Sequence, residues 1–292
     1  MFYQKAFNSI VERLKASDEV LAVMVFGSMV TGDLWEESDI DLFVVINNKM
    51  DNIRNIYTEE KEIAVHVKLM NKEKFIQLYS EDLKGGFIHR IFASSRLVFS
   101  KDMDITSTYD NGRYYPDLDR ERWTMVYLGS VLKRLGICKK YLYNEGLYTA
   151  YSAIVRSIEE YSKLFVNFSG YMISKDAMTM AMNLDDNYKD VVDHLFNYKG
   201  DVKKVIQDTV DFIEKAIDKD IKSMTEILMN FLRNSEGFLS AEEIKNNNLF
   251  QNFEIEMEEI LDKLWEKQII KKDCRDYKSE ETILFNENVY FI

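Results

Sequence analysis

Two short apolar runs near the N-terminus limit the fold of this sequence more than any other feature. They are Leu21–Phe26, which ends at Gly27-Ser28, and Ile40–Ile46, which begins within Asp39-Ile40-Asp41. Apolar runs of this length, bounded by turn residues, are typical of strands buried in a core. We therefore expect two central strands, with a glycine bend after the first and two carboxylates at the start of the second.

The two aspartates are spaced to act together. Asp39 and Asp41 are two positions apart in a predicted strand, so their side chains project from the same face. Paired carboxylates can share a divalent cation, and Mg²⁺ is a cation that binds oxygen ligands. Gly27-Ser28, expected between a strand and a helix, would let backbone N–H groups approach a triphosphate. The pattern predicts a site where Mg²⁺ and an NTP meet.

These residues resemble a known motif. Phe26-Gly27-Ser28 and Ser38-Asp39-Ile40-Asp41 are similar to the GS…DxD motif of the polymerase-beta-like nucleotidyltransferase superfamily. The resemblance implies a nucleotidyltransferase fold over roughly residues 1–100, and Mg²⁺-dependent transfer of a nucleoside monophosphate from an NTP to a hydroxyl of an unidentified small molecule. It implies Asp39 and Asp41 as catalytic metal ligands, and Gly27, Ser28 and Ser38 at the nucleotide. The version with a helical domain behind it is similar to antibiotic nucleotidyltransferases acting on aminoglycosides and lincosamides.

A third strand is expected at Glu62–Leu69, where apolar and polar residues alternate. In members of the superfamily with a full triad, a third carboxylate lies on this strand. His66 occupies the middle of the polar face here, and Mg²⁺ prefers oxygen to nitrogen. Glu62 lies on the same face, nearer the start of the strand. Glu62 and His66 are therefore both catalytic candidates, and a histidine satisfied beneath a loop explains His66 equally well.

Other segments complete a small α/β domain. Helices are expected at Phe2–Ala16, Ile53–Glu60 and Lys72–Tyr79, and an edge strand at Arg96–Phe99. Arg90 is a candidate phosphate ligand, although a plain helix start is the simpler interpretation of the run that contains it, Gly85-Gly86-Phe87-Ile88-His89-Arg90.

Three domains are predicted, which makes the chain an α+β protein. Residues 1–110 form the small mixed sheet domain, and a polar stretch with Pro116 follows as a linker. Residues 116–220 show helical periodicity alone and predict a bundle. Residues 221–292 predict helix, helix, helix and hairpin, the order of a winged helix-turn-helix, with a capping box at Ser240 and Glu243.

The charge of the chain argues against nucleic acid as the main partner. The net charge is −12, and residues 221–292 carry nine Lys and Arg against 15 Asp and Glu. A surface of that sign repels phosphates, which favours a protein contact or homodimer over DNA binding for the C-terminal domain. Two distant cysteines and the lack of an 18-residue apolar run favour a cytoplasmic protein outside the membrane.

Two functions therefore remain open. The first is an enzyme that transfers a nucleoside monophosphate. The alternative is a catalytically degenerate module that binds a nucleotide or a protein, with the C-terminal domain as its interaction or DNA-binding output. Substitution of the third carboxylate by His66 would favour the alternative.

Overall fold

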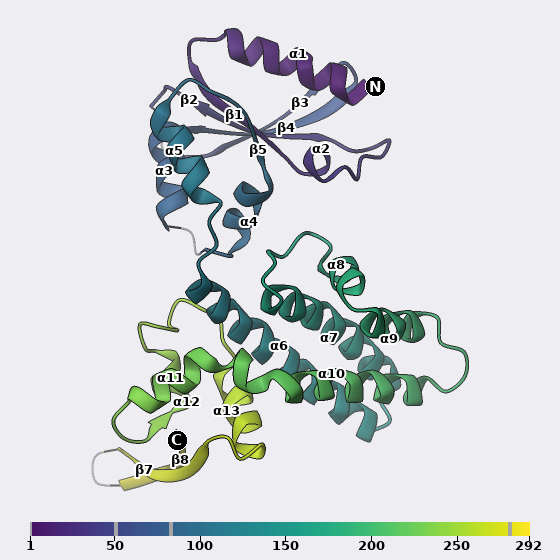
Figure 1. Cartoon of the computed structure of the whole chain (residues 1–292), viewed down its shortest axis with the longest axis vertical. Helices are drawn as coiled ribbons and strands as arrows, with labels where there is room; N and C mark the ends of the chain where they lie inside the picture. The colour runs from purple at the N-terminus through teal and green to yellow at the C-terminus, as the bar shows by residue number, and fades with distance from the viewer. Residues whose placement is uncertain (1, 50–51, 82–83, 280–281) are drawn as a thin grey trace. The chain divides into compact units, whose positions relative to one another are not determined.

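The computed structural model describes residues 2–49, 52–81, 84–279 and 282–292. The chain divides into two compact units, Met1–Pro116 and Asp117–Ile292. The first contains a five-stranded sheet with helices, and the second is mostly helical with a small three-stranded sheet (Figure 1). The predicted α+β class is confirmed.

The sheet of the first unit has the strand order β3-β4-β2-β1-β5. Its strands are β1 (Val20–Phe26), β2 (Ile40–Ile46), β3 (Arg54–Glu60), β4 (Ile63–Asn71) and β5 (Arg96–Ser100). β2 and β4 are parallel and the other neighbours are antiparallel, so the sheet is mixed. The C-terminal end of β1 therefore lies beside the N-terminal parts of β2 and β4, at the same end of the three central strands.

One face of this sheet is covered by α1 (Phe2–Ala16), whose bounds are those predicted (Figure 1). Phe7 and Ile10 of α1 share a core with Val25, Leu42 and Val65, one from each central strand. Alternate residues of the strands must therefore point to the opposite face.

The opposite face is covered by α3 (Lys72–Glu81), α4 (Phe87–Ser94) and α5 (Met103–Gly112). Their core residues pack on Met24 and Phe43 of the sheet. Asp41 is two residues from Phe43 in β2, and His66 is four residues from Met70 in β4, so the side chains of Asp41 and His66 point to this same face. They lie nearer the end of the sheet where β2 and β4 begin.

The helix expected at Ile53–Glu60 is wrong, because β3 occupies these residues. β3 pairs with β4 through the turn Lys61-Glu62, where both residues have positive φ (52° and 67°). Such a two-residue turn matches the twist of a hairpin. β3 is a polar edge strand with Ile56 packed against the core, so it lacks the apolar alternation that identified β4.

The helix expected after Gly27-Ser28 is a single turn, α2 (Ser28–Thr31). Gly32 ends it in the left-handed conformation, with φ of 86°, and donates its N–H to Ser28 O. A turn this short carries little helix dipole, because the dipole sums over aligned peptide units.

The second unit begins with five helices, in agreement with the periodicity of residues 118–220. These are α6 (Asp117–Tyr143), α7 (Leu147–Phe168), α8 (Ala177–Leu184), α9 (Asp186–Phe196) and α10 (Val202–Met224). α6 and α7 lie along one another (Figure 1), and Asn167 Nδ2 donates to Thr124 Oγ1 between them at 2.9 Å. No helix in the described part of the chain is long and apolar enough to span a bilayer.

The remaining elements follow the order helix, strand, helix, helix, hairpin. They are α11 (Glu226–Asn234), β6 (Leu239–Ser240), α12 (Ala241–Lys245), α13 (Met257–Glu266), β7 (Lys271–Ser279) and β8 (Thr282–Phe291). The small sheet has the order β6-β8-β7. The predicted capping box is confirmed: Ser240 Oγ accepts from the Glu243 N–H, and Glu243 Oε2 accepts from the Ser240 N–H.

Candidate functional site

Gly27 forms a bend that L-residues with a side chain rarely adopt. Its φ is 70° and its ψ is −152°, at the junction of β1 and α2. A Cβ atom on Gly27 would lie far inside van der Waals contact of Asp41 Oδ2. Glycine is therefore required twice here, for the backbone conformation and for the approach of the Asp41 carboxylate.

The strand register brings the acidic residues to this bend. Asp41 of β2 is paired with Phe26 of β1 on one side and with His66 of β4 on the other. Asp39 immediately precedes β2, two positions before Asp41, so its side chain reaches the same face. The predicted pairing of Asp39 with Asp41 thus follows from local strand geometry alone.

Asp39, Asp41 and His66 form a compact group. Among the described residues, they are the one set of three whose metal-binding atoms all lie within 4.8 Å of one another. His66 Nδ1 is 2.7 Å from Asp39 Oδ2 and 3.8 Å from Asp41 Oδ1. The Asp41 side chain is 19% exposed, Asp39 32% and His66 41%, so a ligand from solvent can reach all three.

The contact with Asp39 orients the imidazole ring. A neutral ring that donates its Nδ1–H to Asp39 Oδ2 keeps a lone pair on Nε2. The Tyr57 ring packs against His66 at 81° between the ring planes, with the ring centroids 4.6 Å apart. The imidazole is therefore held by a carboxylate and an aromatic neighbour.

The donor set fits a divalent cation in part. Two carboxylates on one face supply the oxygen ligands that Mg²⁺ and Mn²⁺ accept. The third position holds nitrogen, which suits Mn²⁺ or another transition metal better than Mg²⁺. The structure thus places His66 beside Asp39 and Asp41, and identifies a donor set for a divalent cation without selecting the metal.

The other predicted site residues lie at different distances from this group. Glu62 is exposed in the β3–β4 turn, four residues before His66, or about 13 Å along the strand. Ser38 is buried, and its Oγ accepts from the Trp35 N–H at 2.9 Å, closing the loop before Asp39. Ser28 follows the glycine bend, whereas Arg90 is half-buried on α4. The structure therefore brings together Gly27, Ser28, Asp39, Asp41 and His66.

His89, next to Arg90, has a structural role. It is buried, accepts from the Gly85 N–H through Nδ1 at 2.8 Å, and its Nε2–H donates to Tyr114 O at 3.0 Å. Both ring nitrogens are thus used to hold the start of α4 and the segment after α5.

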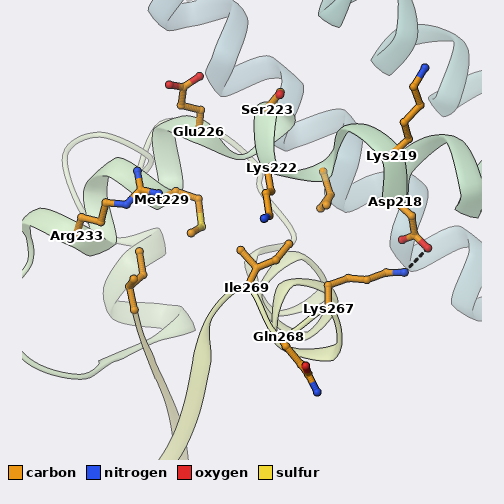
Figure 2. Close-up of a pocket in the computed structure, with 12 residues that line it drawn as sticks. Asp218, Lys219, Lys222, Ser223, Glu226, Met229, Arg233, Lys267, Gln268 and Ile269 are labelled. Atoms are coloured by element: carbon orange, nitrogen blue, oxygen red, sulfur yellow. Dashed lines mark hydrogen bonds and ion pairs between the residues drawn. The ribbon is translucent and has the colours of Figure 1, made fainter.

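Two residues beside the donor set, Asn55 and Tyr57 of β3, were not predicted from the sequence. They line a hollow of about 80 Å³ together with Asp41, His66 and Lys68, the last of which lies on the predicted strand β4. The signal of Asn55 and Tyr57 was the pairing of β3 with β4, which the helical interpretation of residues 53–60 concealed. A larger hollow of about 840 Å³ lies in the second unit between α10, α11 and the turn after α13, and its lining includes none of these residues (Figure 2).

Comparison with known proteins agrees with this geometry. Residues 8–104 match the family model described as Polymerase beta, Nucleotidyltransferase. The chain is also similar to the crystal structure of a nucleotidyltransferase-like protein from Exiguobacterium sibiricum 255-15, with a TM-score of 0.65 and 13% sequence identity, over 99% of both chains. At that identity the likeness shows a shared fold. No curated protein matches the chain.

Proposed function

We propose that this protein transfers a nucleoside monophosphate from an NTP to a hydroxyl group of a small molecule, since residues 8–104 belong to the polymerase-beta-like nucleotidyltransferase superfamily. The observation that carries the proposal is the convergence of Asp39 and Asp41 on the Gly27 bend. Two carboxylates for a cation and a glycine bend whose backbone N–H groups can meet phosphates are the parts that phosphoryl chemistry needs.

The bend at Gly27-Ser28 holds the β- and γ-phosphates in this proposal. The first N–H groups of a helical turn have no partners within the turn, and they point outward from its start. Ser28 adds a hydroxyl at the same place. Since these donors lie at the end of β1, the leaving pyrophosphate would lie on the β1 side of the aspartates.

Asp39 and Asp41 hold the divalent cation, Mg²⁺ or Mn²⁺. When bound, the cation neutralises charge on the triphosphate and on the leaving group. By holding the cation, the carboxylates would also place the α-phosphate at a fixed distance from the bend, and positioning of this kind supplies much of the rate in phosphoryl transfer.

His66 acts as the general base. Asp39 holds Nδ1–H, so the Nε2 lone pair can accept the proton of the acceptor hydroxyl as its oxygen attacks the α-phosphorus. Loss of a positioned base typically costs 10²–10⁴-fold in rate. His66→Ala should therefore reduce transfer far more than it reduces nucleotide binding.

Calorimetry with ATP tests the proposal, with and without Mg²⁺ or Mn²⁺. Wild-type protein should bind ATP in a metal-dependent manner, and Asp39→Ala and Asp41→Ala should each weaken binding by at least tenfold. Asp18→Ala is a matched control, because Asp18 is an exposed loop acid outside the site. Metal-independent binding that survives both substitutions would contradict the proposal.

A second function is favoured by one observation, the replacement of the third carboxylate by His66 in contact with Asp39. In this alternative the domain is catalytically degenerate and senses a nucleotide or a protein partner. Metal-dependent ATP binding without pyrophosphate release, across a broad set of hydroxyl acceptors, would distinguish it from the enzyme.

For the C-terminal segment we propose a protein contact or homodimer. The element order and β6-β8-β7 pairing support a winged-helix interpretation, and its excess of acidic residues opposes DNA. Sedimentation of the full chain tests the dimer. A gel shift with duplex DNA at about 50 mM salt, where electrostatic binding is strongest, tests the DNA-binding alternative.

A further inference from the structure

We infer that the acceptor enters the hollow between β3, β4 and the start of β2, where Tyr57 and Lys68 select a neutral or anionic hydroxyl compound with a flat face and reject polycations. This inference rests on the proposed nucleotidyl transfer. It names the class of acceptor and the two residues that choose it.

The sheet order assigns the acceptor to this side. Along β3-β4-β2-β1, the glycine bend lies at β1, the aspartates at β2, and the hollow at β4 and β3. The attacking and leaving oxygens are roughly in line at a transferred phosphorus, on opposite sides of it. If the pyrophosphate leaves toward Gly27-Ser28, the hydroxyl must arrive from the β4–β3 side.

The size of the hollow limits what it can hold. Its volume is about 80 Å³, whereas pockets for entire small ligands are roughly 300–1,000 Å³. It can therefore receive the reacting end of an acceptor, such as one ring with its hydroxyl. His66 lines the same hollow, which places the proposed base at the point where that hydroxyl would lie.

Tyr57 provides a flat wall. Its ring is 73% exposed, and its contact with His66 is edge-on, at 81° between the ring planes. A large aromatic side chain at such exposure on a polar edge strand gains little from the core. Aromatic rings stack on flat ligand faces, and such contacts add to the gain from buried area alone.

Lys68 sets the charge. Its Nζ donates to Asn55 Oδ1 at 3.2 Å, which holds the ammonium group at the wall of the hollow. Asp41 is the acid among the described lining residues, and its charge is matched by the cation in the proposed complex. Lys68 is therefore the charged side chain that an acceptor meets at this wall of the hollow, and a like charge against a polycation is an effective means of rejection. By this reasoning the acceptor differs from aminoglycosides, which are polycations.

The test uses the full chain saturated with Mg²⁺ and a nonhydrolysable ATP analogue. Saturation-transfer NMR would measure the binding of phenyl glucoside (neutral), phenyl glucuronide (anionic) and kanamycin (polycationic). We expect both phenyl glycosides to bind the wild type and kanamycin not to bind. Tyr57→Ala should weaken both glycosides about fivefold to tenfold. Lys68→Glu should weaken the glucuronide more than the glucoside and admit kanamycin.

Two controls make the result specific. Lys61→Glu changes the same charge in the exposed β3–β4 turn, and Tyr143→Ala removes an exposed tyrosine from α6. Neither should alter the order of the three probes. Binding of kanamycin by the wild type, no binding of either glycoside, or an order unchanged by Lys68→Glu overturns the inference.

The same samples separate this inference from the proposed function. Calorimetry on the wild type reports metal-dependent nucleotide binding independently of the three probes. If nucleotide binds and Lys68→Glu leaves probe selection unchanged, the acceptor inference fails and the nucleotidyl-transfer proposal stands. If no nucleotide binds, the proposed function fails, and probe binding still reports on the hollow.

Discussion

Gly27 shows how one residue can support both the bend and the metal donors. Its φ of 70° favours glycine, and a Cβ atom would collide with Asp41 Oδ2. Gly27→Ala should destabilise the protein by about 1–3 kcal/mol through backbone strain and displacement of Asp41. It should also weaken metal-dependent ATP binding by at least tenfold. Urea unfolding and calorimetry measure the two effects.

Gly170→Ala is the matched control for that substitution. Gly170 also has positive φ (89°), but a Cβ atom on it would have no other atom within 4 Å beyond its own chain neighbours. It should show the backbone cost without any change in ATP binding. Equal binding by wild type and Gly27→Ala would contradict the role given to the bend.

His66 lies beside the two carboxylates that hold the cation in the proposed site. His66→Asp would place a third carboxylate there, so Mg²⁺ should bind about tenfold more tightly, although the proposed general base is lost. His66→Asn is the control, since it removes the imidazole without adding charge. Calorimetric titration of Mg²⁺ into each variant measures the affinity. Unchanged Mg²⁺ affinity in His66→Asp would show that a side chain at position 66 does not reach the cation.

At the scale of elements, the strands that could be predicted best are those whose apolar residues form a continuous run or alternate with polar ones. Val65 and Val67 are buried and alternate with polar residues, so β4 was identified, and with it the place of His66. β3 has no such pattern, because an edge strand exposes most of its side chains. Its position depends on hydrogen bonds to β4, which a local pattern does not contain. Tyr57, Asn55 and the acceptor hollow were missed for that reason.

The capping box shows the opposite case, a local signal that the structure confirms. Ser240→Ala removes the acceptor for the Glu243 N–H and should lower the free energy of unfolding by about 1 kcal/mol. Ser223→Ala, an exposed serine within α10, should change it by less than about 0.5 kcal/mol. Urea unfolding followed by circular dichroism distinguishes them. Equal effects would mean that the cap contributes no stability.

At the scale of the molecule, residues 117–292 are held together by contacts that cross residue 220. Gly129 of α6 lies so close to Glu256 that a Cβ would be 3.0 Å from the Glu256 Cβ, and Arg122 Nε donates to Leu249 O at 2.9 Å. The local sequence pattern near residue 220 changes, but it does not reveal contacts between residues so far apart in the chain. A boundary between a helical bundle and a winged-helix domain there stays a prediction, which unfolding experiments can test.

Asp218 of α10 offers that experiment, because it joins α10 to α13 and the residue that follows it. Its Oδ1 is 2.9 Å from Lys263 Nζ, and its Oδ2 accepts from Lys267 Nζ (Figure 2). Burial alone would raise the pKa of Asp218, but the hydrogen bonds from Lys267 and Lys263 outweigh it and lower the pKa below its usual value. The ionised form therefore stabilises the folded protein.

Asp218→Asn leaves Lys263, whose side chain is 12% exposed, without its counter-charge, and should cost about 1–3 kcal/mol at pH 7. A lowered folded-state pKa means that this stabilisation is complete above about pH 5 and is lost as the pH falls below about 4. The difference between wild type and Asp218→Asn should therefore be constant from pH 7 to 5 and decrease below it. Asp190 is an exposed acid on α9, so Asp190→Asn should have the same free energy of unfolding as the wild type at each pH. If Asp218→Asn shifts a single urea-unfolding transition that includes all of residues 117–292, the second unit unfolds cooperatively. If it shifts only one of two transitions, the boundary near residue 220 is supported.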